Sequence, residues 1–227
     1  MQRLGMETNW AAEHLQTIRT LMERSALYRR ALAPIMLFAG LVGIVAAVAG
    51  QVLKIETQTG FIGYWMAVAL AGLAGAFLLV RRQALKHAEP FWSPPARRVA
   101  HALLPPLTAG LLLGILHYIV WSQPSLVAPP TGTRDDGGDL FWLPAVWAIF
   151  YGCALHAAGF FTSRGLRWFG WLFIAAGNVI LFGLLLTHLK QVPGLSWQSS
   201  HYQMGFLFGF LQLAYGAYLY LTEKRDL

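Results

Sequence analysis

Five histidines lie near the ends of long apolar segments, where imidazole nitrogens can ligate haem iron or a divalent metal. Two haems would need axial pairs at matched depths on facing helices. His101 with His156 is the candidate inner pair, and His117 with His188 or His201 is the candidate outer pair. The segment that carries His156 has no second histidine to complete two pairs with the preceding segment. We therefore expect interfacial histidines bonded to water, lipid headgroups or neighbouring carbonyls, with haem and metal binding as alternatives.

Other reactive groups are scarce. Cys153 is the single cysteine, so the chain forms no internal disulfide and holds no cysteine-based metal site. The apolar segments contain no serine and no charged residue, which disfavours an intramembrane serine protease and an ion-driven transporter. The acidic run at 135–139 lacks the ligand spacing of a calcium loop, and no metalloprotease or phosphate-binding motif is present. We therefore expect no enzymatic activity and no bound cofactor.

Two amide side chains, Asn178 and Gln212, lie deep within apolar segments. An amide in hydrocarbon finds partners on neighbouring helices, for about 0.6 to 2 kcal/mol. The first interpretation is therefore hydrogen bonding between helices. The alternative is a polar pathway for a solute, which loosening of the helix at Pro105-Pro106 would help to open. Small-xxx-small motifs at 110–114 and 205–209 predict close helix packing.

The elements that position these residues are six continuous apolar runs. A helix needs ~20 apolar residues to cross a hydrocarbon core of ~30 Å, and each run is about that long. Only 12% of the 227 residues are charged, about half the share typical of a soluble domain. The predicted fold is all-α, a polytopic bundle of six transmembrane helices within residues 31–221. These helices are expected at 31–52, 61–80, 100–121, 140–161, 168–189 and 204–221.

Basic residues divide unevenly between the two sides of this bundle. Of the 17 Lys and Arg residues, 14 fall on one side and 3 on the other. This asymmetry predicts a multi-pass membrane protein with both termini, including the tail at 222–227, in the cytoplasm. The roles of basic residues in topology and in contact with the lipid bilayer then explain the net charge of +7. Nucleic-acid binding is not expected.

A separate amphipathic helix is predicted over residues 1–30, on the cytoplasmic side. One seam of this helix is formed by residues at successive spacings of 4, 3, 4 and 3, namely Ala11, Leu15, Ile18, Met22 and Ser25. Arg24 lies on the other side with further charged residues. Three interpretations stay open: the helix lies on the membrane surface, it packs beneath the protein's own helices, or it docks a partner or a second copy. The candidate docking residues are Leu15, Ile18, Met22 and Arg24.

The pattern EHLQTIRTLMERS at 13–25, followed by YRRALAP at 28–34, resembles a family of uncharacterised bacterial multispan inner-membrane proteins. Members of that family place an IRxxMERS-type helix just before several hydrophobic spans. The resemblance covers roughly the first 35 residues and the multispan layout after them. It implies a location in the inner membrane and a specific use for the charged pattern of the helix. It implies no catalytic residue.

The leading functional hypothesis is a non-enzymatic inner-membrane protein. It would anchor or regulate a cytoplasmic or membrane partner through the helix at 1–30 and the basic connection at 81–99. The first alternative is a small facilitator of an apolar or amphipathic solute, which would use Asn178, Gln212 and the Pro105-Pro106 region. The second alternative is a haem-binding membrane redox protein that would use the histidine pairs.

Overall fold

The computed structural model describes residues 32–86, 94–123, 142–190 and 197–223. Within these ranges the chain is helical, and six helices are long and apolar enough to cross a membrane. The protein is thus a multi-pass, all-α membrane protein, as the apolar runs predicted. The amphipathic helix predicted at 1–30, with Leu15, Ile18, Met22 and Arg24, and the tail predicted at 222–227 fall largely or wholly outside the described residues.

The first helix matches its predicted run to within one residue, and the other helices begin and end at other residues than their apolar runs. Five are uninterrupted: the first helix (Leu32–Val52), α2 (Gln58–Lys86), α3 (Pro94–Ser122), α5 (Trp142–Gly159) and α6 (Arg164–Lys190). Most extend past the predicted runs, because polar and basic residues are tolerated once the helix reaches the headgroups. The sixth span is divided, and consists of α7 (Trp197–Met204), the π-helix η1 (Gly205–Phe210) and α8 (Leu211–Glu223).

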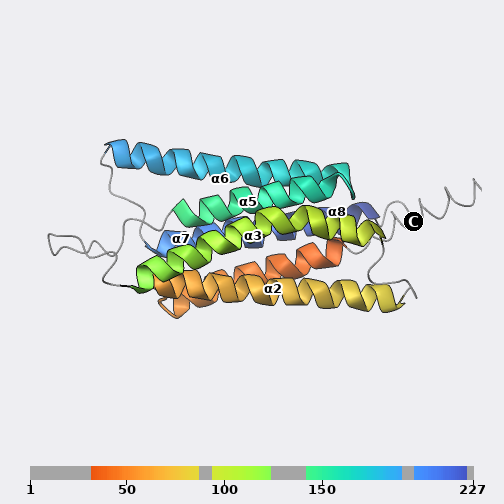
Figure 1. Cartoon of the computed structure of the whole chain (residues 1–227), viewed down its shortest axis with the longest axis horizontal. Coiled ribbons are helices and arrows are strands. Elements are labelled where there is room, and N and C mark those ends of the chain that lie inside the picture. The colour runs from red at the N-terminus through yellow and green to blue at the C-terminus, as the bar shows by residue number, and fades with distance from the viewer. Residues whose placement is uncertain (1–31, 87–93, 124–141, 191–196, 224–227) are drawn as a thin grey trace, which may run out of the picture.

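Successive helices run antiparallel along the long axis of the molecule (Figure 1). One end gathers 7 of the 9 Lys and Arg residues in the described ranges, and we call it the basic end. The first helix begins at this end, α8 finishes there, and the α5–α6 turn lies there (Figure 1). The residues concerned are Arg81, Arg82, Lys86, Arg97, Arg98, Arg164 and Arg167.

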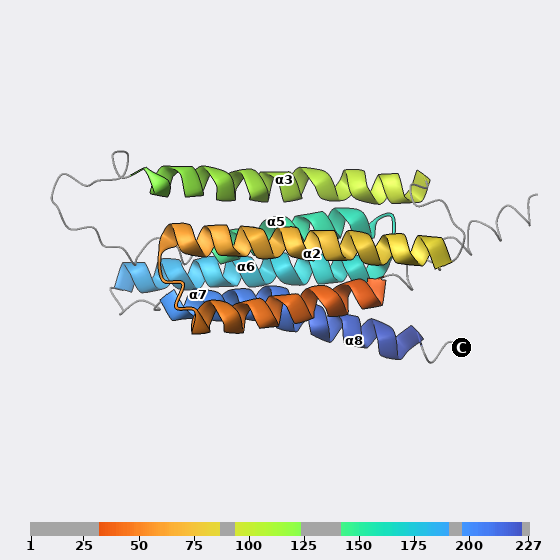
Figure 2. The ribbon, with the colours of Figure 1, turned by 90° about the horizontal axis from the view of Figure 1, so that it is seen from below.

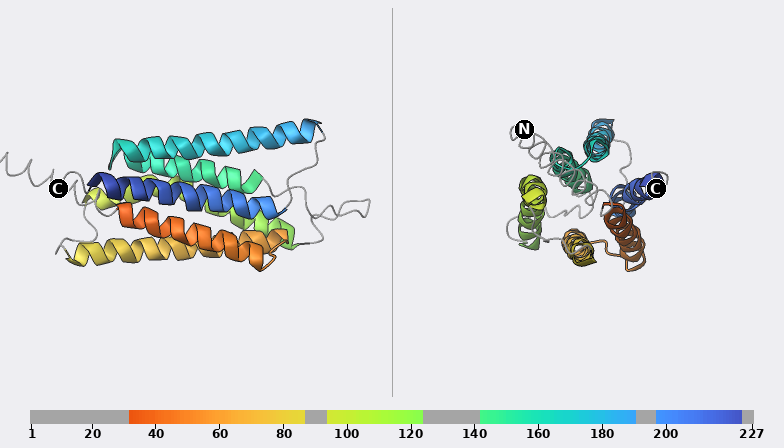
Figure 3. Two further views of the ribbon diagram at one scale, coloured as in Figure 1. Left: turned by 180° about the vertical axis from the view of Figure 1, so that it is seen from behind. Right: turned by 90° about the vertical axis from the view of Figure 1, so that its right-hand side faces the viewer.

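The first and sixth spans lie side by side, although they are far apart in the sequence (Figures 2 and 3). Glycines allow the two backbones to approach. A methyl group added at Gly209 would lie 2.9 Å from the backbone nitrogen of Ile44, and one at Gly40 would lie 2.8 Å from the carbonyl oxygen of Gly209. Gly205 faces Ala47 in the same way. Close packing predicted for the motif at 205–209 is thus confirmed.

The motif at 110–114 packs differently, against side chains of α5. The indole nitrogen of Trp147 donates a hydrogen bond to the carbonyl oxygen of Gly110 at 3.0 Å, and the same ring lies over Gly114. Glycine here leaves room for a tryptophan and does not bring two backbones together. The helix itself continues through Pro105 and Pro106, with the hydroxyl of Thr108 bonded to the carbonyl of Pro105.

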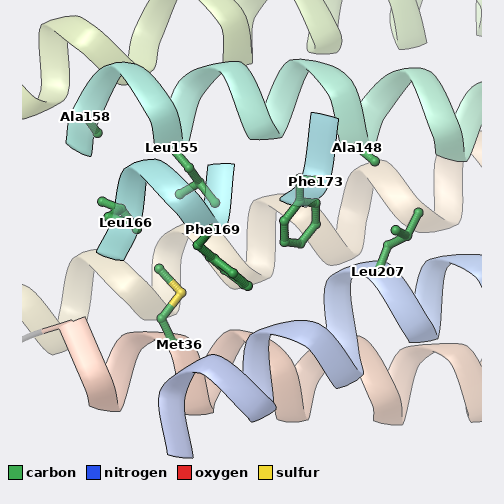
Figure 4. Close-up of a cluster of buried hydrophobic side chains, with 8 residues drawn as sticks. All are labelled: Met36, Ala148, Leu155, Ala158, Leu166, Phe169, Phe173 and Leu207. Carbon is green, nitrogen blue, oxygen red and sulfur yellow. The ribbon is translucent and has the colours of Figure 1, made fainter. Parts of the chain in front are cut away.

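α5 and α6 form a second closely packed pair of neighbouring helices. A methyl group at Gly152 would lie 2.6 Å from the carbonyl oxygen of Gly170, and one at Gly177 would lie 2.5 Å from that of Ala145. Beside this contact, α5 and α6 meet the first helix and η1 in one apolar core (Figure 4). The buried members of this core are Met36, Ala148, Leu155, Ala158, Leu166, Phe169, Phe173 and Leu207.

α2 and α3 leave most of their apolar surface outside the bundle. Only 11% of the most apolar stretch of each helix is buried. The large side chains that they expose near mid-helix include Leu70, Leu73, Phe77, Leu112 and Leu116. A soluble protein rarely exposes so large an apolar surface, whereas hydrocarbon solvates it. The exposure therefore agrees with the spans inferred from length and composition.

Candidate functional site

His201 is the most enclosed histidine in the described part of the chain, at 3% exposed. It lies in α7, at the end of the bundle opposite the basic end, and three aromatic rings surround it. The centroid of its ring lies 5.0 Å from that of Phe61 and 6.1 Å from those of Tyr64 and Trp65. The first helix closes the fourth side, where a methyl group at Gly50 would lie 2.5 Å from the imidazole nitrogen Nδ1.

Both nitrogens of this imidazole are engaged by the protein. The indole N–H of Trp65 donates to Nδ1 at 3.2 Å, so Nδ1 carries no proton, because an indole nitrogen can only donate. Nε2 then carries the proton and donates to the carbonyl oxygen of Ile55 at 3.1 Å. Neither nitrogen presents a lone pair to a metal or a haem iron in this arrangement. His201 instead ties α7 to α2 and to the turn after the first helix.

The other candidate histidines have separate surroundings. His117 packs against the rings of Trp121 and Trp142, at centroid distances of 6.1 and 5.1 Å. His156 packs against Phe160 and Trp171, and its Nδ1 lies 3.4 Å from the carbonyl oxygen of Arg167.

His101 is exposed at the basic end, and only the backbone of His188, within α6, is described. In the described residues, no group of three or more His, Cys, Asp and Glu side chains is placed to hold a metal ion.

Of the two intramembrane amides, Gln212 is buried within the bundle and Asn178 is exposed on its outside. Gln212 is 4% exposed, and its Nε2 donates to the hydroxyl of Tyr151 on α5 at 3.0 Å. This is the bond between helices that the sequence predicted. Asn178 lies on the exposed face of α6, where its Nδ2 donates to the carbonyl oxygen of Ile174 in the same helix at 2.8 Å. The prediction of a partner on a neighbouring helix of the bundle is wrong for Asn178, because Gly177, and not Asn178, faces α5.

The Gln212–Tyr151 bond should be measurable as a coupling between α5 and the sixth span. We expect Gln212→Leu and Tyr151→Phe to be non-additive by about 0.6 to 2 kcal/mol, because each removes the same hydrogen bond. The free energy of unfolding of the native chain, both single variants and the double variant gives this coupling directly. Strictly additive effects would show that the two side chains act independently.

The buried polar residues extend beyond those predicted. Gln58 in the first turn of α2 is 7% exposed, and Ser200 beside His201 is fully buried. The side-chain polar atoms of both have no hydrogen-bond partner among the residues that the structure describes. Gln58, Phe61 and Trp65 share one face of α2 at helical spacing, so this amide is on the face that meets His201. The sequence contained a signal for the burial of Gln58. This glutamine stands just before the apolar run at 61–80 and shares a helical face with Phe61 and Trp65.

A basic pocket opens at the other end of the bundle. Its volume is about 530 Å³, and it lies between the first turns of α3 and the end of α5. Phe160, the neighbour of Phe161, is covered by the guanidinium of Arg167 at 5.0 Å from the ring centroid. The pocket itself combines one aromatic ring, that of Phe161, with the guanidinium groups of Arg97 and Arg98. It is lined by Pro94, Arg97, Arg98, His101, Ala102 and Phe161.

In comparisons with known proteins, no family model, no curated protein sequence and no solved structure matches the chain.

Proposed function

We propose that the chain is a non-enzymatic, multi-pass protein of the bacterial inner membrane, with both termini in the cytoplasm, that anchors or regulates an acidic partner. Its working surface is the basic end together with the amphipathic helix predicted at 1–30. One observation carries the proposal: the described cations gather at the end where the chain enters its first membrane helix, and a pocket opens among them. The resemblance of residues 13–34 to inner-membrane proteins supports the location.

The chemistry of this end favours an anionic group. Arg97 and Arg98 are exposed and line the pocket, and a guanidinium binds a carboxylate or phosphate through two parallel hydrogen bonds. A surface that carries several like charges also steers an oppositely charged partner towards itself. The apolar seam with Ile18 and Met22 would supply the hydrophobic part of the same interface.

The positions of the two amides do not support the facilitator alternative. Asn178 lies on the outer face of α6, and Gln212 is bonded to Tyr151. The two amides therefore do not line one passage through the described bundle. The haem hypothesis is weakened at His201, where both nitrogens are engaged.

The test is a crosslinked pull-down from native membranes. We expect the Ile18→Asp, Met22→Asp variant to recover at least about tenfold less of the partner than the native chain does. Each new carboxylate would be buried and desolvated at the interface. The matched control is Gln16→Asp, Thr20→Asp, which places the same charges on the opposite side of the helix at 100° per residue. This control should retain the partner.

A charge-reversal variant tests the basic end separately. The Arg97→Glu, Arg98→Glu variant should bind the same partner more weakly, whereas Lys54→Glu at the opposite end should leave that binding unchanged. Basic residues also direct topology, so equal membrane insertion of the two variants is verified before binding is compared. An identical partner list for all five chains would contradict the proposed function.

A further inference from the structure

α6 carries a polar side chain at its midpoint on the face that points away from the bundle. Asn178 stands 14 residues after Arg164 and 12 before Lys190, the two ends of the helix. At 1.5 Å per residue it is about 20 Å from either charged end, which is the middle of a hydrocarbon core of ~30 Å. Its side chain is exposed there.

The described bonding of Asn178 leaves this amide isolated from the other helices. Nδ2 donates to the carbonyl oxygen of Ile174 within α6. The Asn178 side-chain carbonyl thus faces a medium that has no donor to offer. Polar groups in membrane-spanning helices are normally turned inwards and paired with a neighbouring helix. An outward amide at this depth therefore indicates a helix outside the described bundle.

The residues around Asn178 form a packing seam. α6 lies at the periphery of the bundle, with α5 on its inner side (Figures 1 and 3). Five of its exposed residues recur at spacings of 4, 3, 4 and 3, the repeat by which two helices pack along their length. Small Ala175, one turn before the amide, permits close approach. The exposed seam residues are Trp171, Ala175, Asn178, Phe182 and Leu185.

We infer that this seam of α6 packs against the same seam of a second copy of the chain, with the two Asn178 side chains bonded to each other. A twofold axis along the membrane normal places identical residues at identical depth. An amide is both a donor and an acceptor, so two copies of Asn178 satisfy one another and need no further group. A different protein would have to present its own polar side chain at the same depth.

The pairing of each Asn178 with its copy also fixes the register in which the two seams meet, because a shift of either helix would separate the two amides. The seam therefore favours a dimer in which the α6 helices run parallel. This inference does not rest on the proposed function. Its consequence for that function is that two basic ends would lie side by side.

Disulfide crosslinking in native membranes tests the pairing. The chain is first freed of its own thiol by Cys153→Ala, and Ala175→Cys is then added. Facing residues in such a seam come within the 4.4–6.8 Å Cα separation that a disulfide requires. We expect mild oxidation to produce an adduct of twice the 25.1 kDa chain mass. Adding Asn178→Leu should lower the dimer equilibrium constant about three- to thirty-fold, and Asn178→Gln should recover most of it.

Ala71→Cys is the matched control, because Ala71 is an exposed alanine near the middle of α2. It should give no dimer. Equal crosslinking from Ala71 and Ala175 would mean random collision and would overturn the inference, as would no adduct at Ala175 or an adduct with a different protein. Thermal unfolding of the reduced monomer should be unchanged by Asn178→Leu, and a large loss of stability would instead assign Asn178 to the fold of the single chain.

Discussion

The His201→Ala variant should unfold with a free energy about 4 to 8 kcal/mol lower than that of the native chain. Removing a buried ring leaves a cavity, and truncating an aromatic side chain in this way typically costs about 3–5 kcal/mol. The indole N–H of Trp65 would also lose its partner, at about 1–3 kcal/mol for a buried group, whereas the carbonyl of Ile55 is only partly buried. The loss should appear as a large decrease in the thermal unfolding midpoint in detergent.

Two companion variants separate packing from hydrogen bonding. Tyr202→Ala removes a neighbouring ring of similar size that is 64% exposed, and it should change stability little. His201→Phe keeps most of the ring volume but pairs with neither polar group, so it should recover only part of the loss. If His201→Phe is as stable as the native chain, the two hydrogen bonds contribute nothing.

The free energy of unfolding of the Gly152→Ala variant should be about 2 kcal/mol lower than that of the native chain, although alanine is the better helix former. The new methyl group would lie 2.6 Å from the carbonyl oxygen of Gly170 and 2.8 Å from the backbone nitrogen of Ile174. Both are backbone atoms of α6, so relief requires the two helices to separate. Overpacking of this kind typically costs about 1–3 kcal/mol. Gly152→Leu should prevent the close pairing of α5 and α6 altogether.

Gly72→Ala is the matched control for this effect. Gly72 lies within α2, and nothing lies within 4 Å of a methyl group built there. The substitution should be neutral or stabilise the chain by up to about 1 kcal/mol, since alanine favours the helix. Opposite signs for the two variants, measured by thermal unfolding, would establish the backbone approach. Equal effects would contradict it.

The sequence predicted the parts of the fold that depend on composition. Long apolar runs specify the six helices. Because successive helices run in opposite directions, every second connection lies at the same end of the bundle, and the connections that carry the basic residues share one end. The close approach at 205–209 was also predictable, because glycine at that spacing has a known packing use. The α5–α6 contact had an equivalent signal that was missed. Gly152 and Gly159 are seven residues apart, and so are Gly170 and Gly177.

Which way a side chain points around its own helix was not predictable. Asn178 and Gln212 look alike in the sequence, as amides in the middle of apolar runs. Their faces differ because Gly177 determines the side of α6 that meets α5. The surroundings of His201 are also non-local, since Trp65 lies 136 residues away in the sequence. A run that is apolar on all sides carries too little periodicity to reveal such pairings.

The contact between the first helix and the sixth span has a consequence for biosynthesis. Gly43 and Gly209 meet in the finished bundle, but 166 residues separate them along the chain. At about 5–20 residues per second, the ribosome takes roughly 10 to 30 s to bridge that interval. α5 and α6, joined by a short turn, can pair as soon as both enter the membrane. The first helix must wait with its glycine-lined face uncovered, so a nascent chain that stalls before its last span exposes a ready surface for membrane quality control.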